Sequence, residues 1–428
     1  MTFKQTVQQT VKRTTVKQPV NQTINQPVQP LKQYEGYRSF QHLTPGKHYK
    51  PYQLPGTERY QSTYDLKLTE SEERIFDTLL KYYPIVSLRD HGFIVPKNPD
   101  DIIPYCRQLH TAYDYEGLAR SGMDVIFENF MDGISLITSQ NGLKWNDVIL
   151  TLGIRYCDIA KQDTVYIAHT YQDLLKAKQS NRIAILPSLE AASILENEVD
   201  RVDVLYGLGI RCMGITYNDA NTLGSGLTEP HDGGLTKFGR KVVERMNQLG
   251  MVIDISHCGD RTSLDVIEAS EAPVMITHAG ARGVWNSPRM KPDDVLQKCA
   301  EKGGVIGVCA APNTTLSAKN PNDHNLESVM EHVEYLIDLV GIDHVGLGPD
   351  TFFGDHVALQ NEFDAMLSLH DSHGNHEYES FPYVTGLENP TEAMSNMIKW
   401  LIKKNYKVLD IEKIIGGNAL RVLEGILV

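Results

Sequence analysis

The chain has 428 residues, of which 41% are hydrophobic and 22% charged, and this predicts a soluble globular protein of one large or two medium domains. Its formal net charge of -13 argues against a general nucleic-acid surface, which needs a basic footprint. That charge suits small-molecule chemistry, although solubility alone also accounts for it. Because no apolar run approaches the roughly 20 residues that cross a bilayer, we predict no membrane segment.

Residues 1–65 differ in composition from the rest of the chain. The stretch up to Gln33 is rich in Gln, Thr, Val and Lys, and no acidic residue precedes Glu35. Such a segment buries too little apolar surface to offset its ordering entropy, so we predict a flexible or extended N-terminal arm. An arm that adds strands to a neighbouring copy, and so supports a homo-oligomer, is the alternative. Residues 66–428 are assigned to a single main domain.

From about residue 66, eight short apolar runs alternate with segments of helical period. The predicted strands cover residues 84–90, 123–131, 182–190, 209–217, 251–258, 272–280, 303–312 and 343–350. Helices are predicted over 235–250, 291–303 and 326–341, and each ends in the glycine expected of a helix C-cap. This alternation predicts a (β/α)8 barrel, or TIM barrel, and an open doubly wound sheet is the alternative.

Polar residues follow several of these apolar runs, where a barrel would place its active site. The run ends carry Glu190, Tyr217, His257, His278 and Asp350. A single histidine in such a place is more often structural, but burying several such groups without compensation would cost several kcal/mol each. Two histidines and a glutamate form a known catalytic zinc set with an open fourth position. We therefore expect Glu190, His257 and His278 to bind zinc, and Asp350 to accept a proton from a metal-activated water.

One arginine lies in a loop on the same predicted face. The stretch "WNSPRMKPDD" follows the sixth run and contains Arg289. An arginine in this place can bind a substrate carboxylate through two parallel hydrogen bonds. A structural salt bridge to a nearby acid is the equally weighted alternative.

Several blocks from about residue 180 to the C-terminus resemble the membrane (renal) dipeptidase family, the M19 metallopeptidases. They are "GLTKFGRKVVERMNQLGMVIDISHC", "APVMITHAGARGVWNSPRMKPDDVL", "HVGLGPD" and "GGNALRVLEGI", and they occur in the family's order. The resemblance implies a (β/α)8 barrel of the amidohydrolase type that holds two zinc ions and hydrolyses dipeptides. The N-terminal third matches poorly.

The resemblance also implies roles for individual residues. A glutamate that bridges the two metals matches Glu190, and the two histidines of one metal site match His257 and His278. The aspartate near the catalytic water matches Asp350, and the arginine for the substrate's C-terminal carboxylate matches Arg289.

Two departures from the family pattern affect the metal and substrate sites. The family's H-x-D motif, which holds the other metal, corresponds to "SLRDH", so Arg89 replaces its histidine and His91 its aspartate. Arginine stays protonated and does not ligate metals. The Arg89 guanidinium would instead occupy part of the space of the lost metal, supply positive charge beside Glu190 and contribute to substrate binding. A shifted loop that brings Asp90 or His91 to a metal is the alternative. The second departure is Tyr217, which replaces a family histidine that contacts the substrate.

These departures favour one zinc ion, leave two ions or a metal-free protein as alternatives, and admit manganese. The predicted activity is that of a metallo-dipeptidase acting on a dipeptide or a similar small amide. Two alternatives remain: a catalytically altered or inactive barrel that acts as a binding or structural protein, and a hydrolase of another small amide, a lactam or a lactone. The six cysteines contain no close CxxC pair, which predicts reduced thiols and a cytoplasmic protein.

Overall fold

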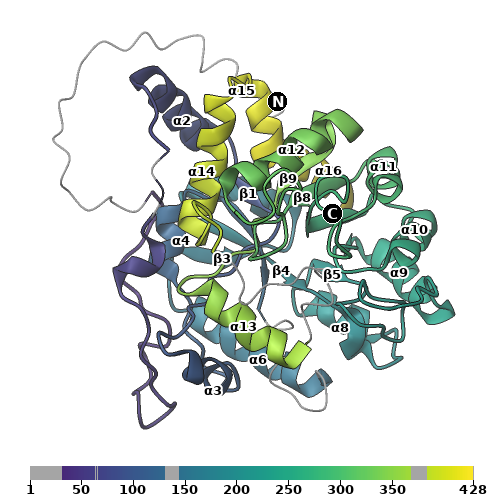
Figure 1. Ribbon diagram of the computed structural model, residues 1–428. Coiled ribbons are helices and arrows are strands. Elements are labelled where there is room, and N and C mark those ends of the chain that lie inside the picture. The colour runs from purple at the N-terminus through teal and green to yellow at the C-terminus, as the bar shows by residue number, and fades with distance from the viewer. Residues whose placement is uncertain (1–30, 63, 65, 131–143, 368–382, 428) are drawn as a thin grey trace.

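The computed structural model describes residues 31–62, 64, 66–130, 144–367 and 383–427. Its strands form one parallel sheet surrounded by helices (Figure 1). Eight strands follow one another in the order β1-β2-β4-β5-β6-β7-β8-β9, while β3 pairs with β4 outside this path. The strands are β1 (Val86–Ser87), β2 (Val125–Asn129), β3 (Val165–Ile167), β4 (Ile183–Leu189), β5 (Cys212–Gly214), β6 (Val252–Asp254), β7 (Met275–Ala279), β8 (Val305–Val308) and β9 (Val345–Leu347).

The first and last strands meet and close the barrel. The amide of Leu88 donates to the carbonyl of Leu347 at 2.9 Å, and the amide of Asp350 donates to the carbonyl of Arg89 at 2.8 Å. The predicted (β/α)8 barrel is therefore confirmed, and each of the eight predicted runs contains one of its strands. The sequence did not predict β3, because a run of three residues between two helices is too short to stand out.

The helices of the described residues precede the first strand, connect the strands and follow the last one. They are α2 (Glu70–Tyr82), α3 (Ile102–Cys106), α4 (Tyr115–Ser121), α6 (Trp145–Ile159), α7 (Tyr171–Ser180), α8 (Arg201–Gly207), α9 (Lys237–Leu249), α10 (Asp260–Ala269), α11 (Asp293–Glu301), α12 (Leu326–Val340), α13 (His356–Leu367), α14 (Pro390–Lys403), α15 (Val408–Glu412) and α16 (Asn418–Ile426). The predicted helices correspond to α9, α11 and α12. Among all these helices, none combines the length and the apolar character needed to span a membrane.

Apolar side chains fill the N-terminal end of the barrel. One buried cluster joins early strand residues such as Val86, Val125 and Val305 with Leu420 and Leu423 of α16. Because this end is packed with apolar groups, the polar residues that follow the strands gather at the opposite, C-terminal end, where a barrel of this kind carries its active site.

Residues 31–62 run along the outside of the barrel, and a buried carboxylate in α6 anchors them. Asp158 accepts hydrogen bonds from the hydroxyl of Tyr37 at 2.8 Å, the hydroxyl of Ser39 at 2.6 Å and the amide of Phe40 at 2.7 Å. Phe40 is buried. The described part of the predicted arm, residues 31–62, is largely without helix or strand and lies in contact with the barrel, while residues 1–30 lie outside the described residues. The domain boundary at residue 65 stays a prediction.

A second buried carboxylate, Asp124, joins the same segment to the barrel. It pairs with Lys32 and with Lys178, the latter at 2.8 Å, and it accepts the amide of Ile85 at 2.8 Å. Removing one partner of a buried ion pair leaves an uncompensated charge. We expect Asp124→Asn to lower the free energy of unfolding by about 3–5 kcal/mol in urea denaturation.

The control for this prediction is an exposed ion pair. Lys298 and Glu301 lie 2.6 Å apart, and both side chains are more than half exposed. Glu301→Gln is expected to change the free energy of unfolding by less than about 1 kcal/mol. Equal effects of the two substitutions would contradict an anchoring role for Asp124.

Candidate active site

Three of the predicted metal ligands converge at the C-terminal end of the barrel. Glu190 directly follows β4, His257 lies three residues beyond β6, and His278 belongs to β7. The Nε2 atoms of the two histidines are 2.9 Å apart, and each lies 3.1 Å from Oε1 of Glu190. All three side chains are buried, and among the described residues they form the one histidine, cysteine and carboxylate cluster with metal-binding geometry.

Local structure brings the strands close enough for this convergence. Gly214 in β5 lies against the backbone of Glu190, where a Cβ atom would be 1.9 Å from the Glu190 carbonyl oxygen. Any side chain at this position would push β5 away from Glu190. The other carboxylate oxygen of Glu190 accepts a hydrogen bond from the side-chain amide of Asn129 at 2.8 Å. This bond orients the carboxylate toward the histidines.

The hydrogen bonds behind the histidines hold their rings in place. Nδ1 of His257 lies 2.9 Å from the side-chain oxygen of Asn218, so it carries a hydrogen. This leaves a lone pair on Nε2 of His257, as a metal-ligating histidine requires. Nδ1 of His278 lies 2.7 Å from the Thr277 hydroxyl and accepts a hydrogen bond from Nε of Arg89 at 3.4 Å.

Electrostatics keeps the three groups in the charge states that suit a cation. Burial is the main cause that lowers the pKa of His278, and burial with the Arg289 charge lowers the pKa of His257 to about 3. Burial alone would raise the pKa of Glu190, but the Arg89 charge and the histidine hydrogen bonds outweigh it and hold that pKa well below its usual range. Two neutral histidines and one carboxylate thus direct three electron-rich atoms at one point. A bound cation removes their mutual repulsion, so the residues fit a zinc-type ion.

The predicted base, Asp350, follows β9 and lies at the edge of this cluster. Its backbone φ is 63°, in the left-handed region that non-glycine residues rarely adopt. Burial alone would raise its pKa, but His278 and His91 outweigh this and lower the pKa of Asp350 below its usual range. The carboxylate is therefore ionised at neutral pH.

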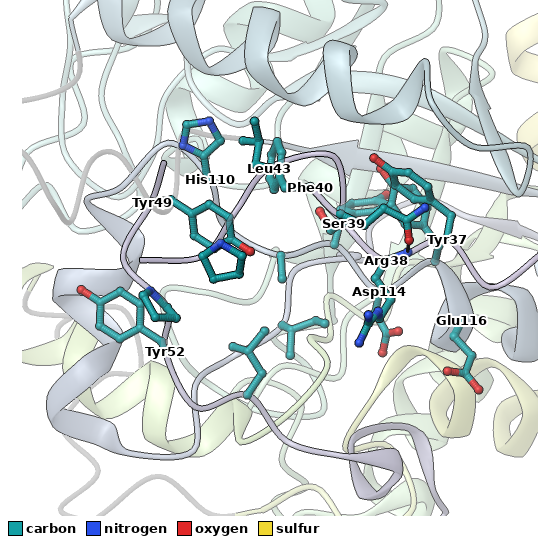
Figure 2. A pocket seen from close by; sticks show the side chains of 18 of the residues that line it. Tyr37, Arg38, Ser39, Phe40, Leu43, Tyr49, Tyr52, His110, Asp114 and Glu116 are labelled. Carbon is teal, nitrogen blue, oxygen red and sulfur yellow. Dashed lines mark hydrogen bonds between the residues drawn. The ribbon is translucent and has the colours of Figure 1, made fainter. Parts of the chain in front are cut away.

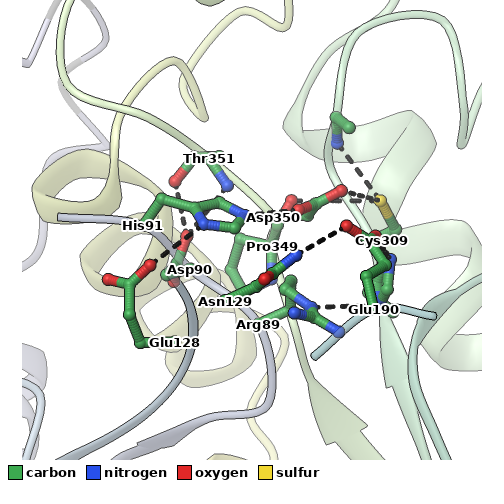
Figure 3. A network of polar contacts seen from close by, with 12 residues as sticks. Arg89, Asp90, His91, Glu128, Asn129, Glu190, Cys309, Pro349, Asp350 and Thr351 are labelled. Atoms are coloured by element: carbon green, nitrogen blue, oxygen red, sulfur yellow. Dashed lines mark hydrogen bonds and ion pairs between the residues drawn. The ribbon is translucent and has the colours of Figure 1, made fainter. Parts of the chain in front are cut away.

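Arg89 occupies the interior of the barrel and is fully buried (Figure 3). Its guanidinium lies 3.4 Å from Asp254 and from Nδ1 of His278, and 3.3 Å from the Ser188 hydroxyl. This side chain follows β1 and brings a permanent positive charge next to the triad of Glu190, His257 and His278, because arginine stays protonated.

His91 does not join the triad, although it was a candidate ligand. Its two ring nitrogens contact the carboxylates of Glu128 and Asp350, each at 3.1 Å. Asp90 also points elsewhere, because it accepts hydrogen bonds from Ser87 at 2.7 Å and from the Thr351 hydroxyl at 2.6 Å.

Tyr217 and Arg289, two of the predicted substrate-binding residues, each contact a histidine of the triad. The ring of Tyr217 stacks on His257, with 4.4 Å between the ring centroids. The buried guanidinium of Arg289 donates to the carbonyl of His278 at 2.9 Å and to that of Ser256 at 3.5 Å. These hydrogen bonds go to backbone carbonyls, whereas the alternative for Arg289 was a salt bridge to an acid.

Sequence reasoning missed the residues that support the site. Glu128 and Asn129 end β2 and contact His91 and Glu190, while Asn218 orients His257. A signal for the first two was present, because an acid and an amide interrupt the apolar run 123–131. Asn218 sits in a loop whose path the sequence pattern does not specify.

A cavity of about 650 Å³ lies apart from this site, between the segment around residues 34–59 and the stretch 105–116 (Figure 2). Among the described residues that line it, none is a predicted site residue. Tyrosines contribute much of the wall, and the hydroxyls of Tyr37, Tyr113 and Tyr115 donate to the internal carboxylates Asp158 and Glu128. Charged side chains line the cavity as well, and of these Arg59 pairs with Asp114.

A sequence model of the membrane dipeptidase family, peptidase family M19, matches residues 151–364. The chain belongs to this family. The match includes Glu190, Tyr217, His257, His278, Arg289 and Asp350, whereas Arg89 and His91 lie before its first residue. The membrane dipeptidase family assignment thus rests on the part of the barrel that carries the triad.

Curated relatives of this M19 chain include fungal dipeptidases. Dipeptidase verJ of Clonostachys rogersoniana is 31% identical over 65% of this chain and 63% of its own length. Dipeptidase tcpJ of Claviceps purpurea is 28% identical over 61% of this chain and 55% of its own length. The alignments therefore span less than two thirds of either relative.

Solved structures share the M19 chain's fold. An amidohydrolase from Pseudomonas aeruginosa has a TM-score of 0.66 at 24% identity, covering 82% of this chain and 99% of its own. A metallopeptidase from Rhodobacter sphaeroides, liganded with a phosphinate mimic of the dipeptide L-Ala-D-Ala, has a TM-score of 0.60 at 18% identity, covering 80% and 99%. At these identities the likeness shows the barrel fold alone.

Proposed function

We propose that this chain is a metal-dependent hydrolase of dipeptides or similarly small amides. The convergence of Glu190, His257 and His278 carries the proposal, because three electron-rich atoms directed at one point suit a divalent cation. Family membership and the dipeptidase names of the curated relatives support the same reaction class.

When bound, the ion supplies Lewis-acid activation of the water and of the substrate carbonyl. Asp350 is the general base that takes the proton from the attacking water, because its carboxylate is ionised and borders the triad. Glu190, His257 and His278 hold the ion. Zinc is the preferred metal for this donor set, and manganese is the second candidate.

The substrate is a small peptide with a free carboxylate. Arg289 supports this, since its charge lies behind His278 and suits a carboxylate partner. Tyr217 flanks His257 and can donate a hydrogen bond to the substrate. The reduced thiols of all six cysteines suit a cytoplasmic enzyme, and a homo-oligomer remains our expectation for its assembly.

The site is proposed to bind one ion rather than two. Arg89 places a fixed cation on the β1 side of the triad, next to Asp254 and His278, and a second divalent ion there would be repelled by it. We expect metal analysis of the zinc-loaded protein to find one ion per chain. The double variant Arg89→His/His91→Asp rebuilds the H-x-D pattern and is expected to bind two. Two tightly bound ions in the unmodified chain would refute the one-ion site.

Activity itself is tested with a panel of dipeptides in the presence of zinc or manganese. We expect turnover of at least one dipeptide, its loss on chelation and its return when metal is added back. The same dipeptide with an amidated C-terminus is the matched control, and it should react more slowly because Arg289 then lacks its carboxylate partner.

Two other functions have distinct signatures in this assay. Bound metal without turnover of any amide would indicate a binding or structural protein. Turnover of lactams or lactones, with dipeptides left intact, would indicate a different hydrolase on the same barrel.

A further inference from the structure

The imidazole of His91 is held on three sides beside the proposed base. Nε2 lies 3.1 Å from Oδ1 of Asp350, and Nδ1 lies 3.1 Å from Oε1 of Glu128 (Figure 3). The ring stacks on Phe352 with the centroids 4.2 Å apart and the planes 8° from parallel. The side chain is 7% exposed, so water competes little for these contacts.

The two contacts require a hydrogen on both ring nitrogens. Ionised carboxylates only accept hydrogen bonds, so His91 donates to Glu128 and to Asp350 at once. Burial alone would lower the pKa of His91, but the hydrogen bonds that His91 donates to the two carboxylates outweigh it and raise this pKa to about 10. With both lone pairs occupied by hydrogens, His91 has no free pair to offer a metal in this arrangement.

Glu128 is fixed in turn by its second carboxylate oxygen. Oε2 accepts the amide of Gly92 at 2.8 Å and the hydroxyl of Tyr113 at 2.7 Å. Tyr113 is itself buried. A chain of hydrogen bonds therefore runs from Tyr113 through Glu128 and His91 to Asp350, and it joins four separate segments of the barrel.

Asp350 needs such support. Its left-handed backbone is strained, and strain of this kind persists only where the surroundings fix the residue. The other carboxylate oxygen, Oδ2, lies 3.9 Å from the sulfur of Cys309, which is a weak donor. His91 is thus the strong donor that fixes Oδ1 and leaves Oδ2 to receive a proton.

We propose that His91 is a positioning residue that orients the Asp350 carboxylate for proton transfer and is itself held by Glu128. The proposal rests on the proposed hydrolase function. In the step that it serves, a water O–H bond breaks and the proton goes to Oδ2 of Asp350. The water oxygen bonds to the substrate carbonyl carbon, the C=O π bond breaks, and its electron pair moves onto the carbonyl oxygen. The hydrogen on Nε2 of His91 stays in place throughout.

The test compares two substitutions in the zinc-loaded full-length protein. His91→Phe keeps a ring that can stack on Phe352 but removes both donors, and His91→Gln keeps an N–H that can reach Asp350. We expect kcat of His91→Phe to fall by about 10–100-fold, with KM and metal content unchanged. The kcat of His91→Gln should lie between those of the wild type and His91→Phe.

His356→Phe is the matched control. His356 is also buried, and its ring packs edge-on against the same Phe352 with the centroids 4.8 Å apart, while its Nε2 contacts Gln360 at 3.2 Å. Replacing it with phenylalanine makes the same substitution as His91→Phe, at another histidine that packs against Phe352. We expect its kcat to stay near that of the wild type.

Three results would overturn the proposal. If His91→Phe loses its metal, His91 is a metal ligand. If its kcat and KM both stay unchanged, His91 is a structural residue. If its KM rises while kcat stays unchanged, His91 contacts the substrate. A crystal structure of His91→Phe tests the contact without any assay, and the expected result is a rotated Asp350 carboxylate. An unrotated carboxylate would refute positioning, whereas a wild type without turnover would refute the hydrolase function instead.

Discussion

Asp350→Asn is expected to lower kcat/KM for dipeptide hydrolysis by about 10²–10⁴-fold, the contribution typical of a general base. Asparagine has the shape of aspartate but does not accept a proton from water at neutral pH. Because Asp350 is not one of the three triad residues, metal content should stay at the wild-type value. Steady-state kinetics and metal analysis on the same samples measure both quantities.

The control for Asp350→Asn lies at the other end of the same strand. Asp343 precedes β9, pairs with Lys413 at 2.6 Å and is 61% exposed. Asp343→Asn removes the same charge from the same region of sequence and should leave kcat/KM near the wild-type value. Equal activities of the two variants would rule out Asp350 as the base.

His278→Ala is expected to abolish both metal binding and hydrolysis. His278 is fully buried, and its Nε2 contacts both other members of the triad. Without it, one nitrogen and one carboxylate remain, which is fewer ligands than a catalytic zinc site provides. Metal analysis after dialysis should find much less than one ion per chain, and circular dichroism should confirm that the barrel still folds.

His169→Ala provides the comparison for this loss. His169 is an exposed histidine that follows β3 and lies outside the triad. Its replacement should leave metal content and turnover intact. A metal-replete, active His278→Ala protein would show that the triad is not the metal site.

The barrel was predictable because its strands and helices have different hydrophobic periods. The eight apolar runs give the strand order directly, and capping glycines such as Gly250 and Gly341 mark the helix ends. The triad followed from the same rule, since the C-terminal ends of parallel strands meet at one face and bring Glu190, His257 and His278 together.

The orientation of side chains beyond the strands was not predictable in this way. Arg89 and His91 are two residues apart, yet Arg89 enters the barrel interior and His91 contacts Glu128 and Asp350. Strand β1 has only two residues, so the path of the chain after it depends on tertiary contacts. One of these is the hydrogen bond from the backbone amide of His91 to the carbonyl of Thr351. Sequence spacing does not encode such contacts, and for this reason the support from Glu128 appeared only in the structure.

The buried guanidinium of Arg89 has a consequence for how the enzyme would respond to metal supply. A divalent ion dissociates and must be replaced from solution, whereas a cation built into the polypeptide is present in every folded molecule. With one exchangeable ion, as we propose, reactivation of the metal-free protein should follow a simple hyperbola in free zinc concentration. A site that needs two bound ions for activity would give a sigmoidal curve. A protein with such a site would lose activity more steeply as the zinc concentration falls.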